Sequence, residues 1–302
     1  METKPGSHAD TRRRRAALVM LVAVALFALM DAGLKTMSER YPPFQVAALR
    51  GAASLPLVLG WSLATIGLRP LLHVRWPLHF LRGLIGIAMM ATFVYALKRM
   101  PLSTAYTIFF VAPLLITALS VPFLGEHVGP RRWTAIAIGL LGVLVVLRPS
   151  GEGMLSLAGL AVLVAALGYA VSAITVRVLA RTDSNQAMVV WLLVLMAIGA
   201  GALAWPDWRP IRHEDWWLIA GIGVVGSFGQ YTITHAFRHG EASLLAPLEY
   251  TALVWGVLLD ATVWGVLPDS ATWLGAAIIV ASGLYLIRRE GARAPAEPIA
   301  PP

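Results

Sequence analysis

Asp31 is a carboxylate inside the apolar stretch Ala16 to Met37, where an ionised side chain is costly unless it faces a partner or water. Lys35 follows four residues later, so on a helix the two side chains share one face and can neutralise each other. The pattern therefore allows two interpretations, a structural ion pair and a binding role for Asp31 in contact with a charged ligand.

Glu249 is a second carboxylate inside an apolar stretch, and it lies two residues after Pro247. A proline inside a helix removes one backbone donor and opens the helix locally. The carboxylate beside this opening, with Tyr250 next to it, is the best candidate for contact with a cationic group or a proton. Asp260, nearer the end of the same stretch, is expected to reach the membrane interface.

Polar and aromatic side chains in other apolar stretches extend this set. Gln230 and Tyr231 belong to a stretch that also contains Ser227 and Thr234, which is more polar than a helix facing only lipid. Aromatic side chains can wall a cavity for an organic ligand, although each one alone is more often explained by packing. We expect binding residues at Asp31, Tyr95, Tyr106, Phe110, Gln230, Tyr231, Glu249 and Tyr250, and bending points at Pro56, Pro113 and Pro247.

Chemistry that needs a metal, a cofactor or a thiol is not expected. His235 and His239 have the i, i+4 spacing of a metal-binding helix, but no third ligand accompanies them in the sequence. The chain has 0 Cys, which excludes disulfides, thiolate catalysis and cysteine metal sites. Solvated histidines near a helix end are the simpler interpretation of the pair.

The composition indicates that these residues sit in a lipid bilayer. The chain has 302 residues, of which 58% are hydrophobic and 13% charged, against about 25% charged in an ordinary soluble domain. Its mean hydropathy is +0.72. The net charge of +8 comes mainly from residues at the ends of apolar stretches, so it indicates membrane topology and not a nucleic-acid partner.

Ten apolar stretches are predicted to cross the bilayer as helices. With the N-terminus in the cytosol, 16 of the 24 Lys and Arg fall on the inner side and eight, Arg50 among them, on the outer side, which favours cytosolic positions for both termini. The basic segment 1–15 is then a cytosolic tail, and the Pro-rich segment 290–302 is a disordered cytosolic tail. The predicted spans are Ala16 to Met37, Phe44 to Ile66, Leu78 to Leu97, Leu102 to Phe123, Trp133 to Leu147, Leu155 to Ala180, Gln186 to Ala204, Trp216 to Phe237, Ala242 to Trp264 and Ala271 to Ile287.

An internal repeat relates the two halves of the chain when the second half is slid over the first without a gap. We call this pairing the repeat alignment, and it matches Gly83 with Gly223, Gly86 with Gly226, Gly125 with Gly265, Trp133 with Trp273, and Arg148 with Arg288. Five spans per copy is an odd number, so the second copy enters the bilayer from the opposite side. We therefore predict an all-α polytopic membrane protein of ten transmembrane helices, built from two inverted five-helix repeats at 16–148 and 149–289. Such repeats are typical of transporters.

A more specific local pattern lies in the first repeat. Pro113 is in the fourth span, Glu126 follows in the sequence FLGEH, and the fifth span ends at Arg148-Pro149. With two five-helix halves, this pattern resembles the EamA family of the drug/metabolite transporter superfamily, and within it exporters of amino acids with broad or aromatic specificity. The second copy departs from the family pattern, with Val266 where Glu126 would repeat.

The resemblance implies a fold and a function. It implies that the first, third, fourth, sixth, eighth and ninth spans surround a cavity while the fifth and tenth lie at the periphery. It also implies a secondary-active exporter of small metabolites, with amino acids as the favoured substrates, that works by alternating access in the bacterial cytoplasmic (inner) membrane. The alternative is import or export of another metabolite, such as a nucleoside, purine, sugar derivative or drug. The expected partners are a small zwitterionic substrate and the lipid bilayer, and a monomer and a homodimer both remain open.

The sequence gives little support to other classes of function. A G-x-x-x-x-G-K-[ST] loop is absent, which argues against direct use of ATP. An intramembrane enzyme is the distant alternative, since neither H-E-x-x-H nor G-x-G-D occurs. We therefore do not expect an enzyme.

Overall fold

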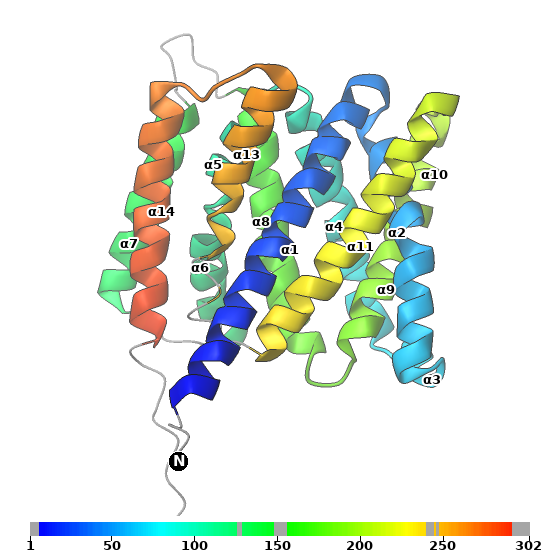
Figure 1. The fold of residues 1–302 in the computed structure, drawn as a ribbon, viewed down its shortest axis with the longest axis horizontal. Helices are drawn as coiled ribbons and strands as arrows, with labels where there is room; N and C mark the ends of the chain where they lie inside the picture. The colour runs from blue at the N-terminus through cyan, green and yellow to red at the C-terminus, as the bar shows by residue number, and fades with distance from the viewer. Residues whose placement is uncertain (1–5, 126–128, 148–155, 240–244, 246–247, 292–302) are drawn as a thin grey trace, which may run out of the picture.

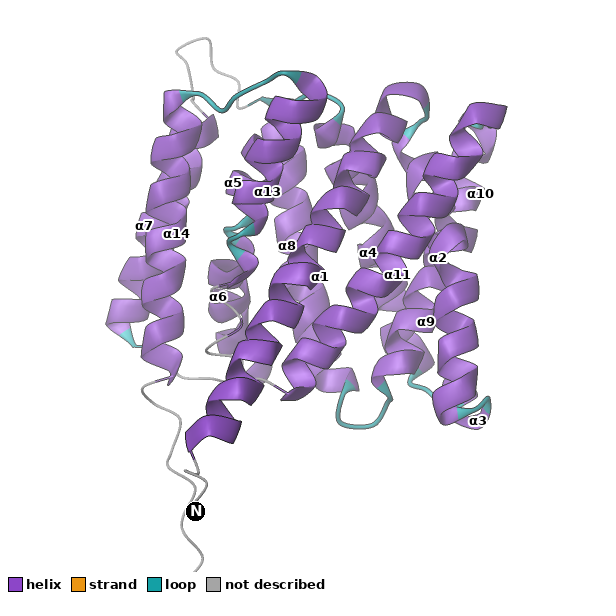
Figure 2. Ribbon diagram, in the orientation of Figure 1, coloured by secondary structure: helices purple, strands orange, loops and turns teal. Residues whose placement is uncertain are grey.

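The computed structural model of the chain describes residues 6–125, 129–147, 156–239, 245 and 248–291. The regular structure in these residues is helical, which confirms the all-α class, and this part of the chain contains no strand (Figure 2). The elements are α1 (Gly6–Arg40), α2 (Pro43–Ile66), α3 (Arg69–Leu72), α4 (Trp76–Leu97), α5 (Leu102–Phe109), α6 (Ala112–Leu124), α7 (Pro130–Leu147), α8 (Leu157–Leu179), α9 (Asn185–Leu195), α10 (Gly201–Ala204), α11 (Trp216–His239), α13 (Ala252–Leu259) and α14 (Ser270–Gly291), the π-helical turns η1 (Met196–Ala200) and η4 (Asp260–Trp264), and the short 3-10 turns η2 (Trp205–Asp207) and η3 (His213–Asp215).

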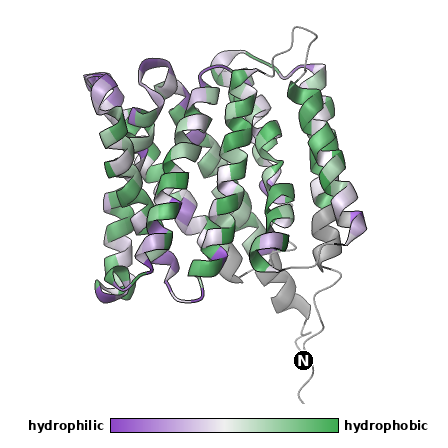
Figure 3. Cartoon of the chain, turned by 180° about the vertical axis from the view of Figure 1, so that it is seen from behind, coloured by the Kyte–Doolittle hydropathy of each residue, from purple (hydrophilic) through white to green (hydrophobic). Residues whose placement is uncertain are grey.

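Apolar and polar residues form separate bands across the bundle, as a bilayer requires. Apolar residues cover its middle, and hydrophilic residues gather at its two ends (Figure 3). Six helical segments are long and apolar enough to cross a membrane, and three shorter apolar helices accompany them. Each of the ten predicted stretches contains a described helix, although part of the ninth lies outside the described residues. The count of ten crossings stays a prediction.

The start of α1 and the end of α14 lie on the same side of the bundle. We call this side the lower end, as in Figure 1, where α1 rises from it and α14 comes back down to it. The side where α1 meets α2 is the upper end. α1 already begins at Gly6, so part of the predicted N-terminal tail is helical, and α14 continues to Gly291. The remainder of the predicted C-terminal tail lies outside the described residues.

The helix pairs follow the repeat alignment. α1 packs along α11, and α4 packs along α8. These pairs correspond to each other, because residue 157 at the start of α8 aligns with residue 17 of α1, and residue 216 at the start of α11 aligns with residue 76 of α4. α7 and α14 form a third extensive pair at one edge of the bundle, where the resemblance placed the fifth and tenth spans (Figure 1). Each pair joins one half of the chain to the other, which is consistent with two interlocked repeats.

Two glycines with a left-handed backbone mark equivalent helix ends. Gly125 follows α6 with φ 69°, and Gly265 follows η4 with φ 66°. The two positions are matched in the repeat alignment. Only glycine adopts this conformation without a steric cost, so the aligned glycines terminate corresponding helices in the same way.

Irregular turns also occur at matching places, with different residues in the two halves. Pro56 lies inside α2, and its counterpart in the repeat alignment, Met196, begins the π-turn η1. Pro122 lies inside α6, and its counterpart Thr262 lies in the π-turn η4. A proline and a π-turn both interrupt the regular i→i−4 hydrogen-bond ladder. α2 nevertheless runs through Pro56, a predicted bending point, as one helix.

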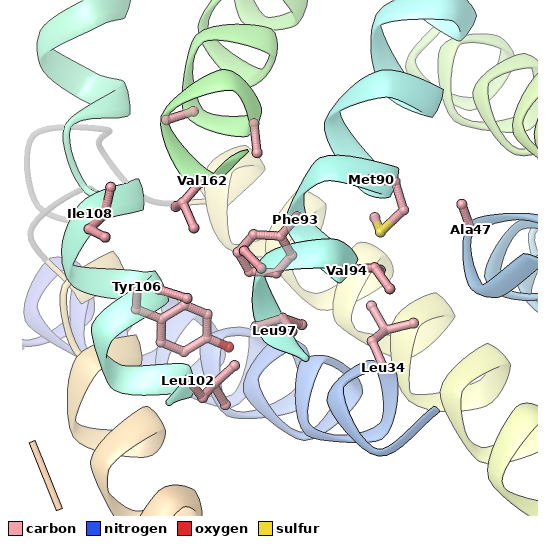
Figure 4. Packing of buried hydrophobic residues seen from close by; sticks show 14 of the residues in the cluster. Leu34, Ala47, Met90, Phe93, Val94, Leu97, Leu102, Tyr106, Ile108 and Val162 are labelled. Atoms are coloured by element: carbon pink, nitrogen blue, oxygen red, sulfur yellow. The ribbon is translucent and has the colours of Figure 1, made fainter. Parts of the chain in front are cut away.

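The largest cluster of buried side chains lies where α1, α4, α5 and α8 meet. Leu34 of α1, Leu97 of α4 and Leu102 of α5 are completely buried. Phe93 and Tyr106 pack in the same cluster (Figure 4). Because lipid is as apolar as these side chains, van der Waals contact and not exclusion of water holds the helices together here.

α11 approaches α2 closely at Gly223. A Cβ atom at this position would collide with the carbonyl oxygen of Ala53, which belongs to the backbone and cannot rotate away. Small residues at such contacts let membrane helices pack backbone to backbone. Gly221 lies on the same helix but faces open space.

We expect Gly223→Ala to destabilise the protein by about 1–3 kcal/mol, because the added methyl group overpacks the contact with Ala53. Gly221→Ala is the matched control, and it should leave the stability unchanged or raise it slightly. Thermal unfolding of both purified variants in detergent measures the difference. Equal stability of the two variants would contradict the close approach of α11 to α2.

Candidate functional site

The fourth span is broken near its middle. α5 ends at Phe109 and α6 begins at Ala112, with Phe110 and Val111 forming a turn between them. Pro113, at the start of α6, has no backbone N–H and cannot continue the hydrogen-bond ladder of α5. At the predicted bending point Pro113 the regular α-helix is thus interrupted for two residues, Phe110 and Val111.

The ninth span is broken at the corresponding place. Tyr250 and Thr251 form a turn just before α13, and the repeat alignment matches them with the two residues of the first break. The backbone hydrogen bonds match as well. Val111 N donates to Ile108 O at 3.2 Å in the first break, and Thr251 N donates to Leu248 O at 3.0 Å in the second. Both halves of the chain therefore carry the same local interruption.

The two breaks meet through aromatic rings. The ring of Phe110 packs edge-on against the ring of Tyr250, with centroids 5.0 Å apart and planes at 67°. These residues are equivalent in the two halves, so the contact joins corresponding positions of the two repeats. Broken helices leave backbone groups free for a ligand, and in membrane carriers they often form the substrate site. Pro247, the bending point predicted beside the second break, lies outside the described residues.

Asp31 is connected to the first break through Tyr106. The Tyr106 hydroxyl donates a hydrogen bond to Asp31 Oδ2 at 2.8 Å, and its ring lies 6.4 Å from the ring of Phe110. The ion pair that the sequence allowed between Asp31 and Lys35 is not formed, because the ammonium of Lys35 binds elsewhere. The structure thus brings Asp31, Tyr106, Phe110 and Tyr250 into one cluster.

Lys35 binds the end of α4 at the upper end of the bundle. Its Nζ donates to the carbonyl oxygens of Leu97 at 2.8 Å and Met100 at 2.6 Å. It also lies 5.2 Å from the centre of the Trp264 ring. A cation is favourable at a helix C-terminus, where the last carbonyl groups have no partner within the helix.

Asp260 is completely buried, so the expectation that it reaches the interface is wrong. Its carboxylate accepts hydrogen bonds from Leu102 N at 2.9 Å, Ser103 N at 2.7 Å and Ser103 Oγ at 2.6 Å. These groups form the first turn of α5. A carboxylate from the second half therefore caps a helix of the first half. The position of Asp260 along its own helix gave no sign that its carboxylate would bind the first turn of α5.

Glu249 lies beside the second break. It is half-buried, and its charge acts on the hydroxyl groups of Tyr169 and Tyr250. The ring of Phe109 lies 5.4 Å from that of Tyr169 and 5.6 Å from that of Phe93. A row of aromatic rings and two carboxylates thus flank the two breaks.

Three other predicted binding residues lie outside this cluster. Tyr95 is near the upper end of α4, where the guanidinium of Arg99 lies 3.6 Å from the ring centre. Tyr231 packs against Trp61 at 5.8 Å, and both line an apolar cavity of about 290 Å³ between α2 and α11. Gln230 precedes Tyr231 on α11. A role for these residues in binding stays a prediction.

Arg50 is a candidate that was not recognised from the sequence, where it counted only as an outer charge. It lies inside α2, with Nη1 3.8 Å from Met196 Sδ. Its Nε is buried and has no hydrogen-bond partner in the described part of the chain. Its place inside the predicted span Phe44 to Ile66 was the signal that could have revealed it.

Charged groups outside the spans join loops at both ends of the bundle. At the upper end Asp215 accepts a hydrogen bond from the Tyr41 hydroxyl at 2.6 Å and pairs with Arg40. Burial and this hydrogen bond raise the pKa of Tyr41. At the lower end Asp183 lies 2.9 Å from His79 Nε2, and although burial opposes ionisation, hydrogen bonds from its neighbours lower the pKa of Asp183. Within the described ranges no group of three His, Cys, Asp or Glu side chains could hold a metal ion.

We expect Asp260→Ala to destabilise the protein by on the order of 3 kcal/mol, because buried N–H groups of α5 lose their acceptor. Asp260→Asn keeps one acceptor oxygen and should lose less. Thermal unfolding in detergent measures both variants, with Asp207→Ala on the exposed turn η2 as the control. If Asp260→Ala is as stable as Asp207→Ala, Asp260 does not cap α5.

Known proteins match almost the whole chain. The EamA-like transporter family matches residues 14–148 and again residues 156–289. A riboflavin transporter of Vibrio cholerae is 31% identical over 279 residues, which cover 91% of this chain and 93% of that protein. An S-adenosylmethionine uptake transporter of Rickettsia conorii is 28% identical, covering 85% of this chain and 86% of that protein. The pseudopaline exporter CntI of Pseudomonas aeruginosa is 26% identical, covering 80% and 86%.

A solved crystal structure has the same fold, with a TM-score of 0.63 and 22% identity over 93% of this chain and 100% of that chain. The three relatives are named as transporters, which agrees with the expectation that the chain is not an enzyme. None of the three is named for amino acids, and one is an exporter while another works in uptake, so the amino-acid exporter type has no support from them. This chain is a multi-pass integral membrane protein that belongs to the EamA-like transporter family.

Proposed function

We propose that this chain is a secondary transporter for a small metabolite that joins an aromatic ring system to a strongly polar tail. The observation that carries the proposal is the meeting of the two helix breaks at Phe110 and Tyr250, with Asp31 and Glu249 beside them. Aromatic side chains favour a flat ring of the substrate. Carboxylates and the free backbone groups of broken helices favour its polar tail.

The hydroxyl of Tyr250 supports a ligand at this place. It is buried, and it has no hydrogen-bond partner among the residues that the structure describes. A Cβ atom on Gly283 of α14 would collide with this hydroxyl, so the glycine makes room for it. The hydroxyl therefore lies against α14, and because an unpaired buried hydroxyl costs about 1–3 kcal/mol, a polar group of a substrate that reached it there would relieve this cost.

The named substrates of two relatives belong to the same chemical class. Riboflavin and S-adenosylmethionine each combine a heteroaromatic ring system with a polar tail. Aromatic amino acids, nucleosides and purines also contain a ring, so the amino-acid substrate predicted from the sequence stays within the class when its side chain is aromatic. The direction of transport depends on the gradients that drive it, and it has to be measured separately.

The mechanism we propose is alternating access about the two breaks. Their equivalent positions let each half adopt the conformation of the other, which exposes the central cluster first to one side and then to the other. The breaks at Phe110 and Tyr250 are better bending points than Pro56, because α2 continues through that proline. In this conformation Lys35 and Asp260 hold the upper end together.

Counterflow in proteoliposomes with radiolabelled riboflavin, S-adenosylmethionine, adenosine and phenylalanine tests the proposal. We expect saturable exchange of at least one of these probes, reduced about tenfold by Tyr250→Ala because the ring contact is lost. Phe228→Ala, which removes an exposed ring from α11, is the matched control and should exchange normally. Exchange no greater than in empty vesicles for all four probes would contradict the proposed substrate class. An equal loss in Phe228→Ala would show that the effect of Tyr250→Ala is not specific to the breaks.

A further inference from the structure

Arg50 carries a positive charge inside α2 without a matching acceptor. It lies about 10 Å along the helix axis from the first residue of α2, Pro43. Among the described residues its only hydrogen-bond acceptor is the thioether of Met196, at 3.8 Å from Nη1, and a thioether is a weak acceptor. The buried Nε has none. A guanidinium in this position is costly in a bilayer, so an anionic group of a ligand would bind favourably to it.

Three other charged residues inside the bundle have hydrogen-bond partners in place. Lys35 donates to two carbonyl oxygens, and Asp260 accepts three hydrogen bonds. Arg82, whose Nε is also unpaired, still donates to the carbonyl oxygen of Met188. Of these four residues, Arg50 alone has no oxygen or nitrogen partner in the described part of the chain. The lack of such a partner at Arg50 is therefore not shared by Lys35, Asp260 or Arg82.

Asp31 is close enough to Arg50 to act on its charge but does not touch it. The two groups interact electrostatically. They form no ion pair in the described structure, and Asp31 Oδ2 accepts its hydrogen bond from the Tyr106 hydroxyl. A cation and a carboxylate that interact electrostatically without forming an ion pair, with the Tyr106 hydroxyl bound to the carboxylate, complement a molecule that carries both charges.

The backbone at Arg50 is held firmly in place. Gly51, the next residue, packs against η1 so closely that a Cβ atom would lie 2.9 Å from the backbone nitrogen of Ala197. η1 is a π-helical turn, a feature that is frequent at functional sites. This contact fixes α2 beside η1, so Arg50 is a positioned cation and not a mobile surface one.

We propose that Arg50 and Asp31 form a subsite for a zwitterionic tail of the transported metabolite, in which Arg50 binds the carboxylate and Asp31 binds the ammonium group. The subsite rests on the proposed function and narrows its substrate class to zwitterions that carry a ring. A guanidinium can bind a carboxylate through two parallel N–H···O hydrogen bonds. Tyr106 joins the subsite to the aromatic rings at the breaks.

The test uses S-adenosylmethionine and its decarboxylated analogue, which differ only in the carboxylate. Equilibrium binding to the purified protein should show that the wild type prefers the carboxylated probe by about tenfold or more. Arg50→Gln should abolish this preference, and Arg50→Lys should restore part of it. Arg99→Gln, at an exposed arginine after α4, is the matched control and should keep the preference. A preference that survives in Arg50→Gln overturns the subsite.

A measurement without ligand tests whether Arg50 is only structural. Arg50→Met should leave the thermal midpoint of the empty protein unchanged or lower it only slightly, because no oxygen acceptor loses its donor and Asp31 keeps its hydrogen bond from Tyr106. A clear loss of stability would overturn the subsite. If the wild type binds neither probe but exchanges riboflavin, the subsite is wrong while the proposed function stands. If none of the four counterflow probes exchanges, the proposed function fails as well.

Discussion

In the hydrocarbon core of a membrane, every backbone N–H and C=O group must find a partner inside the protein. The joint between α4 and α5 lies at the upper end of the bundle, but Leu97, Leu102 and Ser103 beside it are buried in the protein, so the last carbonyl groups of α4 and the first N–H groups of α5 have the same need. Lys35 of α1 supplies the donors, and Asp260 of η4 supplies the acceptors. Because α5 is short and ends at the first break, these two charges hold the broken span in place.

The same constraint makes the two halves chemically unequal. Thr175 and Ser120 stand where the repeat alignment would place counterparts of Lys35 and Asp260. Both hydroxyl groups hydrogen-bond to carbonyl groups of their own helices, and neither carries a charge. The halves thus share their breaks and helix pairs but not their charged contacts. Alternating access requires the two conformations to have similar free energy, so substrate binding has to offset the charged contacts at the upper end.

Much of the fold could be predicted because hydropathy and proline act locally. The apolar stretches coincide with described helices, and Pro113 marks the first break. The second break has Leu253 where Pro113 would repeat, and the signals for it in the sequence are the nearby Pro247 and the internal repeat. Asp260 and Lys35 were misjudged for a different reason. Their positions along their own helices give a depth in the membrane, but their partners come from helices far away in the chain.

The candidate site was predicted in part. Asp31, Tyr106, Phe110 and Tyr250 come together because α5 and α13 pack against each other and against α1. The contribution of Arg50 was hidden because a count of charges for topology treats an arginine inside a span like one in a loop. The substrate could not be derived from residue types alone, since aromatic rings and carboxylates suit several classes of metabolite.

Distances across both ends of the bundle test most directly whether the two halves exchange conformations about the breaks. The chain has 0 Cys, so spin labels can be placed on introduced cysteines without a background. One variant carries Lys98→Cys and Val266→Cys at the upper end, and another carries Leu18→Cys and Phe123→Cys toward the lower end, all at exposed positions. In pulsed electron paramagnetic resonance of transport-competent protein, addition of the transported probe should change the two distances in opposite directions. Distances that stay fixed, or that lengthen together while transport continues, would contradict the account.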